Sequence, residues 1–156
     1  MRGLDTNILV RHFVDEDDPQ TTAARSFLRT LTLEDPGYVS TVALIEMWWV
    51  LSKSYGMERA GLIRTIGRML ADPHLRVEHE SEVAEAVNRF VMGSADFQDY
   101  LIERRCATAG CSQTMTFDRS AARSAGMALL AHNPIDAPAP RSVSAPSTAK
   151  IAAAMP

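Results

Sequence analysis

Residues 4–11 read Leu-Asp-Thr-Asn-Ile-Leu-Val-Arg, which combine the end of an apolar run, a short polar turn and the start of a helical pattern. Its first residue, Leu4, ends the segment Met1–Leu4, which we interpret as the first β-strand. Asp5 then lies between that strand and a short helix. Residues 116–119, Thr-Phe-Asp-Arg, repeat the arrangement, because Asp118 also directly follows a predicted strand. The carboxyl ends of strands line the ligand crevice of an open parallel sheet. The two aspartates are therefore candidates for one site, although each could instead cap the helix that follows it.

Short apolar runs alternate with helical patterns along the rest of the chain. The pattern predicts strands over 1–4, 37–40, 75–77, 113–117 and 127–130, and helices over 8–14, 19–33, 42–54, 58–70, 81–91, 96–107 and 119–125. Strands that alternate with helices indicate an α/β fold with a parallel sheet and helices on its faces.

The composition is that of an ordinary globular protein. The chain has 156 residues, 46 % apolar and 22 % charged, with a formal net charge of −3, which excludes collagen-like, coiled-coil and fully disordered chains. No segment supplies the roughly 18 uncharged apolar residues that a membrane span needs. We expect one domain over residues 1–133, followed by a flexible tail rich in Pro, Ala and Ser over residues 134–156.

The N-terminus and the cysteines both indicate a cytoplasmic protein. The first residues lack the apolar stretch of a signal peptide. Two cysteines, Cys106 and Cys111, cannot build a disulfide framework or a zinc site, so we expect reduced, partly buried thiols.

Glu46 breaks the pattern of its surroundings. It is the only charged residue between Pro36 and Ser52, within a predicted helix that is apolar on every side and therefore expected to be buried. A buried carboxylate must be protonated, paired or metal-bound. A structural ion pair with an arginine and a functional role are both open.

A further acidic group begins the helix predicted over 96–107. Asp96, Asp99 and Glu103 are spaced so that they lie on one helical face, where like charges repel. Asp96 as a helix cap and Glu103 as a solvated side chain would account for two of them. Asp99 is then the acid that needs a functional explanation.

Asp5, Glu46, Asp99 and Asp118 together form a candidate metal site. Clustered carboxylates repel unless a divalent cation holds them, and all-oxygen ligation suits Mg²⁺ or Mn²⁺. Such an ion lowers the pKa of its bound water and stabilises charge on a phosphate, which is the chemistry of phosphodiester hydrolysis.

These motifs resemble the PIN-domain family and, within it, the VapC-like toxins of bacterial toxin–antitoxin pairs. The matching pieces are LDTNILVR at 4–11, Glu46 in ALIEMWWVL, ADFQDYLI at 95–102 and TFDR at 116–119, in family order. The resemblance implies a three-layer α/β/α sandwich with a central, mainly parallel sheet. It also implies a Mg²⁺- or Mn²⁺-dependent endoribonuclease that acts as a toxin.

Carried over by position, the family's four acids are Asp5, Glu46, Asp99 and Asp118. Asp5 and Asp99 are the expected direct metal ligands, with Glu46, Asp118 and possibly Asp96 bound directly or through water. Residues expected to orient waters or carboxylates are Thr6, Asn7 and Thr116. Candidates for holding RNA phosphates are Arg11, Arg119 and Arg123. Each could instead be an ordinary surface charge or an ion-pair partner.

The resemblance also implies a homodimer and a cognate antitoxin that blocks the site with a helix. Trp48 and Trp49 are candidates for that contact or, alternatively, for the core. Two other functions stay open: a housekeeping RNA-processing or DNA-directed PIN nuclease, and a PIN scaffold used only for binding. The presence of all four acids counts against the scaffold.

Overall fold

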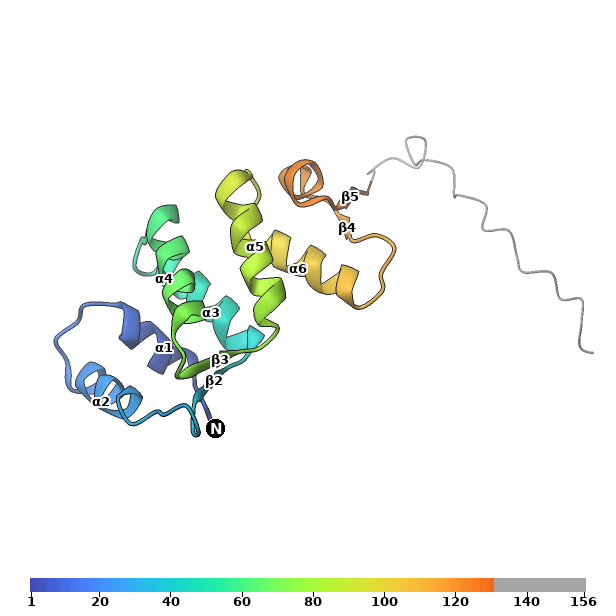
Figure 1. The fold of residues 1–156 in the computed structure, drawn as a ribbon. Helices are drawn as coiled ribbons and strands as arrows, with labels where there is room; N and C mark the ends of the chain where they lie inside the picture. Colours follow the sequence, from blue (N-terminus) through green and yellow to red (C-terminus); the bar gives the residue numbers. More distant parts are fainter. Residues whose placement is uncertain (131–156) are drawn as a thin grey trace, which may run out of the picture.

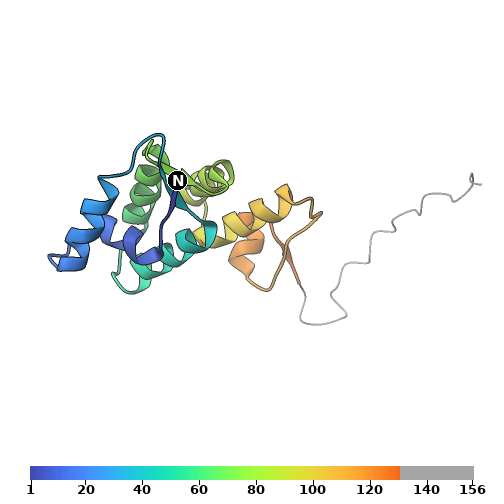
Figure 2. The ribbon, with the colours of Figure 1, turned by 90° about the horizontal axis from the view of Figure 1, so that it is seen from below.

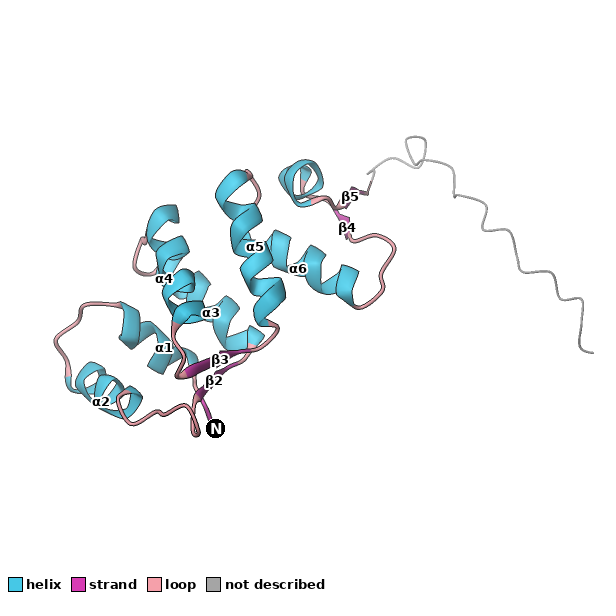
Figure 3. Ribbon diagram, in the orientation of Figure 1, coloured by secondary structure: helices cyan, strands magenta, loops and turns pink. Residues whose placement is uncertain are grey.

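Short strands alternate with helices along residues 1–130, the part of the chain that the computed structural model describes (Figures 1 and 3). The elements in chain order are β1 (Arg2–Gly3), α1 (Thr6–Phe13), α2 (Pro19–Leu28), β2 (Gly37–Val39), α3 (Thr41–Lys53), α4 (Arg59–Ala71), β3 (Leu75–Val77), α5 (Glu80–Met92), α6 (Phe97–Thr108), β4 (Met115–Thr116), the π-helix η1 (Ala121–Ala125) and β5 (Ala128–Leu129). The predicted elements are all present, and most of their ends shift by one or two residues. The tail predicted over 134–156 lies outside the described residues.

The helix α2 is shorter than predicted. It was expected to reach residue 33, but α2 ends at Leu28. The backbone N–H of Thr30 donates to the carbonyl of Phe27 at 2.9 Å, and the Thr30 hydroxyl donates to the same oxygen at 2.7 Å. A side chain that takes a helical carbonyl competes with the next helical hydrogen bond, so the helix stops there.

Short polar side chains set the starts of α2 and α3. The Asp18 carboxylate accepts from Gln20 N at 2.7 Å at the start of α2, beside Pro19 in the first turn. At α3 the cap is Ser40, whose hydroxyl accepts from Ala43 N at 3.2 Å. Such caps satisfy N–H groups that have no partner within the helix.

Every strand pair is parallel, which confirms the predicted α/β class. β1 pairs with β2 (Gly3 beside Tyr38), and β2 pairs with β3 (Tyr38 beside Arg76), giving the order β1-β2-β3. The second pair is β4 with β5, with Met115 beside Ala128. Within residues 1–130 the strands thus form two sheets, whereas one central sheet was expected.

An aromatic cluster in the core joins the helices around the first sheet. Trp48 of α3 stacks on Phe97 of α6 with ring centroids 4.4 Å apart, and meets Phe90 of α5 edge-on at 5.2 Å. Leu44 and Leu51 on the same side of α3 are fully buried. α6 is therefore fixed against α3 and α5 at its N-terminal end.

The segment 115–129, which comprises β4, η1 and β5 and is called the C-terminal unit below, is anchored on α5 and α6. The Ser124 hydroxyl lies 2.5 Å from the Tyr100 hydroxyl and accepts from Ser94 N at 2.9 Å. Arg89 donates to the carbonyl of Ala125 at 2.7 Å. These contacts hold the C-terminal unit beyond α6 and away from β1, which explains the division of the sheet (Figure 2).

Two smaller expectations concern the thiols and membrane spans. Cys106 is partly buried and Cys111 is exposed, and neither forms a disulfide. Within residues 1–130, no helix is long and apolar enough to cross a membrane.

Candidate active site

Asp5 and Glu46 are linked through Thr6. Asp5 is the cap of α1, and its Oδ1 accepts from the Thr6 backbone N–H at 2.8 Å. The Thr6 hydroxyl donates to Glu46 Oε2 at 2.6 Å, across from α1 to α3. Thr6 itself is buried while Glu46 is exposed, so this link is partly buried. We call Asp5, Thr6 and Glu46 the N-terminal half-site.

The expectation that Glu46 is buried is wrong. Its side chain is exposed, and it shares an outward face of α3 with Val42 and Trp49, which are also exposed. The opposite face of α3, with Leu44 and Trp48, fills the core. An all-apolar stretch predicted burial, but exposed apolar patches also occur on surfaces that bind other molecules.

Asp99, Asp96 and Asp118 form a second acidic group, which we call the C-terminal half-site. Asp96 caps α6, and its backbone N–H donates to Asp99 Oδ2 at 3.1 Å. Burial raises the pKa of Asp99, and the charges of Asp118 and Asp96 raise it further, while the hydrogen bond from Asp96 N acts in the opposite direction. The cap Asp96 and the candidate site acid Asp99 are thus neighbours in one group. Glu103, one turn beyond, is held by Arg89 at 2.6 Å and belongs to an ion pair.

Asp118 both follows a strand and starts a helix. It comes directly after β4 and Phe117, and its Oδ1 accepts from Ser120 N at 2.6 Å and Ala121 N at 3.2 Å. The Thr116 hydroxyl accepts from the backbone N–H of Asp118 at 3.0 Å. Both interpretations of this aspartate, as cap and as candidate ligand, are therefore compatible.

The two half-sites are not brought together in one chain. Among residues 1–130, no group of three or more His, Cys, Asp or Glu side chains is placed to hold a metal ion. The carboxylates whose charges act on Asp99 are Asp118 and Asp96; within the described part of the chain, Asp5 and Glu46 are not among them. The acids are of the right chemical type for Mg²⁺ or Mn²⁺, and within the described residues they lie in two separate groups.

The remaining predicted residues lie at different distances from the acids. Asn7 and Arg11 line a groove between α1 and α2, where Arg11 donates to the side chain of Gln20. Arg119 and Arg123 are exposed on either side of the start of η1, in the same unit as Asp118. The structure thus places two of the three arginines in the same unit as Asp118 and the third against α2.

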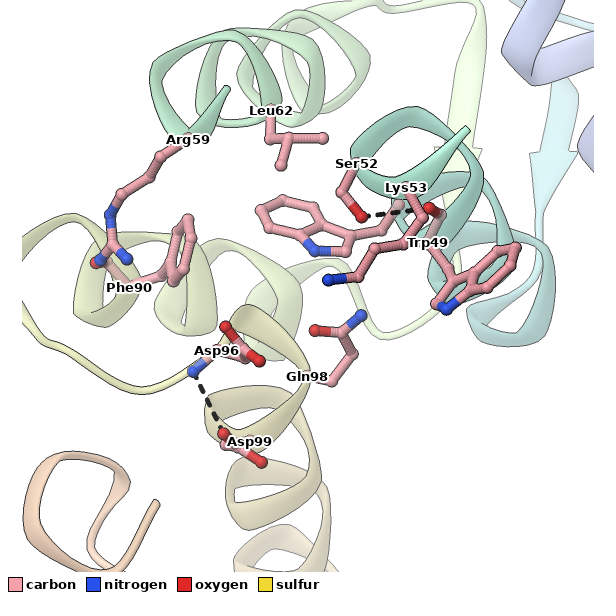
Figure 4. A pocket seen from close by; sticks show the side chains of 10 residues that line it. Trp49, Ser52, Lys53, Arg59, Leu62, Phe90, Asp96, Gln98 and Asp99 are labelled. Carbon is pink, nitrogen blue, oxygen red and sulfur yellow. Dashed lines mark hydrogen bonds between the residues drawn. The ribbon is translucent and has the colours of Figure 1, made fainter. Parts of the chain in front are cut away.

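A pocket of about 400 Å³ lies where α3 and α4 meet the start of α6 (Figure 4). Its wall includes Asp96 and Asp99 on one side and Trp49 and Lys53 on the other, with Gln98 between them. The sequence analysis missed Lys53 and Gln98 as site residues. One signal was available for Lys53, because it is one of only two lysines beside fourteen arginines.

The two tryptophans have different roles. Trp48 is a core residue, stacked on Phe97. Trp49 is 55 % exposed and borders both the pocket beside Asp99 and a shallow apolar hollow beside Glu46. Only Trp49 is therefore available to contact a ligand or a partner.

Comparison with known proteins identifies the family. No curated protein matches the chain significantly. The model of the PIN domain matches residues 4–127, which span both half-sites and the strands β2, β3 and β4. PIN domains are generally metal-dependent nucleases that use Mg²⁺ or Mn²⁺, and helices with parallel strands agree with their three-layer α/β/α fold. The chain belongs to the PIN domain family.

Proposed function

We propose that this protein is a Mg²⁺- or Mn²⁺-dependent endoribonuclease, and that it is the toxin of a toxin–antitoxin pair. The proposed site comprises Asp5, Glu46, Asp99 and Asp118, with Asp96 as an outer ligand. Thr6 and Thr116 orient carboxylates and the backbone beside them. The half-buried Asp99 carboxylate, with the charges of Asp118 and Asp96 upon it, is the observation that carries the proposal. Like charges gathered in this way are costly unless a cation is held between them.

RNA is the substrate that the surroundings of Asp99 favour. A strand of RNA is bound through its phosphates by cations and through its unstacked bases by aromatic side chains. Lys53 and Trp49 face Asp99 across the pocket, and Arg119 and Arg123 are exposed next to Asp118. These cations lie beside the acids although the chain as a whole is slightly acidic. We therefore expect binding that weakens as salt rises.

The toxin role rests on the resemblance of the four acidic motifs to those of VapC-like toxins. With it come a homodimer, a cognate antitoxin that occludes the acids, and activity in the cytoplasm. The exposed apolar face of α3 beside Glu46, with Val42 and Trp49, suits an antitoxin helix. We therefore expect the antitoxin to inhibit the nuclease directly.

The test is cleavage of total cellular RNA by the purified chain, free of any partner. Reactions contain Mg²⁺, Mn²⁺ or EDTA, and the variants are Asp5→Ala and Asp99→Ala. The matched control is Glu34→Ala, which removes an exposed carboxylate from the loop before β2. We expect discrete cuts that need metal. The cleavage rate should fall by about a hundredfold or more in both variants and stay unchanged in the control.

Two outcomes would reject parts of this proposal. Cleavage by Asp5→Ala at the wild-type rate would remove the N-terminal half-site from the active site. A folded protein that cuts neither RNA in Mg²⁺ nor RNA in Mn²⁺ would exclude the ribonuclease, and the same reactions with single-stranded and duplex DNA would then test the DNA-directed alternative.

A further inference from the structure

β1 has an open edge. Its Arg2 N–H donates to Pro36 O at 2.8 Å, and the Leu4 N–H donates to Tyr38 O at 2.9 Å. Alternate residues of a parallel strand bond the same neighbour, so the N–H and C=O of Gly3 face away from β2. Within residues 1–130 β1 lies at the end of its sheet, and a Cβ placed on Gly3 would meet nothing within 4 Å. An added strand would find both space and hydrogen-bonding groups there.

The sheet of the C-terminal unit is too small to be stable alone. It consists of β4 and β5 alone, and these strands are parallel. Parallel sheets are normally covered on both faces, and two strands are too few for independent stability. Yet Met115 of β4 is 52 % exposed and Leu129 of β5 is 47 % exposed. This small sheet has the features of one that continues into a partner.

The C-terminal unit cannot reach β1 of its own chain without breaking buried contacts. Its η1 residues Ala121 and Ala125 are fully buried, and Ser124 is held by Tyr100 and Ser94. α6 is in turn fixed by the stacking of Phe97 on Trp48. The unit, α6 and α5 are therefore joined rigidly, on the far side of α6 from β1 (Figure 2).

We propose that the active site is completed between two copies of this chain: β4 of one protomer adds in parallel to the open edge of β1 of the other, and joins the C-terminal half-site of the first to the N-terminal half-site of the second. The proposal rests on the proposed function for the identity of the site.

The chemistry of the acids supports a second copy as the occupant. Asp5 directly follows Leu4 at the end of β1, and Asp118 comes just after β4, so parallel pairing sets the two side by side at a strand spacing of about 4.8 Å. Joining the half-sites gives one ion all four carboxylates that the proposed function assigns to it. Reciprocal exchange gives a two-fold dimer with two complete sites and no free edge at β1 or β4.

Complementation between inactive variants tests this directly. Asp5→Ala and Asp99→Ala are each inactive alone, but a mixed dimer holds one site with both substitutions and one site with neither. With random assembly, half of the dimers are mixed and each has one of its two sites intact, so co-expressed chains should recover about a quarter of wild-type activity. Mn²⁺ binding, measured by calorimetry, should recover in the same proportion.

The matched control pairs two substitutions in the same half-site. Co-expressed Asp5→Ala and Glu46→Ala leave no intact site in any dimer, so neither cleavage nor Mn²⁺ binding should return. If the Asp5→Ala and Asp99→Ala mixture stays as inactive as its components while the wild type cleaves RNA, the site is complete within one chain and the shared site is overturned, with the ribonuclease unaffected. If the wild type binds Mn²⁺ without cutting RNA, the ribonuclease fails and recovery of Mn²⁺ binding still decides whether the site is shared. If the wild type binds no Mn²⁺, both proposals fail.

Gly3 provides a second test that does not depend on activity. Gly3→Pro removes the N–H that faces the added strand, whereas Gly3→Ala keeps it, and neither touches the hydrogen bonds between β1 and β2. By light scattering, we expect the wild type and Gly3→Ala to be dimers and Gly3→Pro to be a folded monomer. A wild-type monomer, or a Gly3→Pro variant that remains as dimeric as Gly3→Ala, would overturn the strand addition.

Discussion

The N-terminal and C-terminal half-sites hold the same type of side chain in two different electrostatic settings. Asp5 and Glu46 are separated by the Thr6 side chain and backbone, whose hydroxyl and N–H donate one hydrogen bond to each. Asp99 instead has the charges of Asp118 and Asp96 upon it, and its pKa is raised. Donors can satisfy two carboxylates without a cation, but they do not remove the repulsion among three. A bound cation would therefore stabilise the C-terminal half-site more than the N-terminal one.

The strands beside the two half-sites also differ in how firmly they are attached to the rest of the domain. β1 is fastened to the body of the domain, because both the N-terminal amine and Arg2 bind Asp35, at 2.6 and 2.7 Å. β4 and β5 are partly exposed and depend on η1 for their attachment. The firmly attached strand β1 thus has an open edge, and the more exposed strand β4 is the strand proposed to pair with it.

The largest effect is expected where the two regions join. Phe97→Ala removes the ring that stacks on Trp48 and leaves a cavity between α3 and α6, since Phe97 is fully buried. Removing a buried phenylalanine ring costs about 3–5 kcal/mol in the free energy of unfolding, which urea titration measures. The control is Ile102→Ala on the exposed side of the same helix, which should change it by no more than about 0.5 kcal/mol. Similar losses in both variants would mean that Trp48 and Phe97 do not hold the regions together.

The attachment of the C-terminal unit is tested at Gly93. A Cβ at this position would lie 1.8 Å from the Tyr100 hydroxyl and 2.5 Å from Ser124 Oγ, so Gly93→Ala must displace the pair that fixes η1. We expect a loss of about 1–3 kcal/mol, as for overpacking in a core. Gly67→Ala, in the exposed middle of α4 with nothing within 4 Å, should instead stabilise by about 1 kcal/mol.

The setting of the N-terminal half-site is tested at Thr6. Thr6→Val keeps the shape of the buried side chain and removes the donor to Glu46 Oε2, whereas Thr6→Ser keeps the donor. Loss of a group that orients a ligand typically costs 10–100-fold in activity, so we expect about that loss of RNA cleavage in Thr6→Val and near wild-type cleavage in Thr6→Ser. Equal activity in the two variants would show that Glu46 needs no orienting hydroxyl.

Most of the fold could be predicted because its signals are local. The alternation of apolar runs and helical spacing depends on neighbouring residues, and β3 matches its predicted range over Leu75–Val77. The division of the strands into two sheets could not be predicted, because it depends on contacts between distant residues, such as Ser124 with Tyr100.

The candidate site was predictable in its residue types and not in its assembly. Asp5 and Asp118 were singled out because each follows a strand, and Asp96 was anticipated as a cap. The exposure of Glu46 was missed, since an apolar helix looks the same in sequence whether its outer face meets the core or solvent. The link through Thr6 needs two residues forty positions apart to meet, which no spacing rule indicates.

The smallest effect is expected from removing the charge at Asp99 without metal. Burial and the neighbouring charges raise its folded pKa above the ordinary value of 3.8, so ionising Asp99 disfavours the folded state. At a pH below 3.8 the group is protonated in both states and contributes nothing. As the pH rises from 3.8 to the folded pKa, the stability of the wild type falls, and above the folded pKa it stays at a lower plateau. Asp99→Asn, whose amide oxygen still accepts from Asp96 N, should therefore raise the melting temperature near pH 7 in EDTA, and not at about pH 3.

Adding Mn²⁺ should reverse the order of the two proteins near pH 7. A ligand that binds only the folded state stabilises it, and the charged wild type offers the better site. Asp17→Asn, in the exposed loop before α2, should match the wild type with and without the metal. An Asp99→Asn variant that melts below the wild type in EDTA would show that the Asp99 carboxylate stabilises the fold, and the contrast between the half-sites would then be lost.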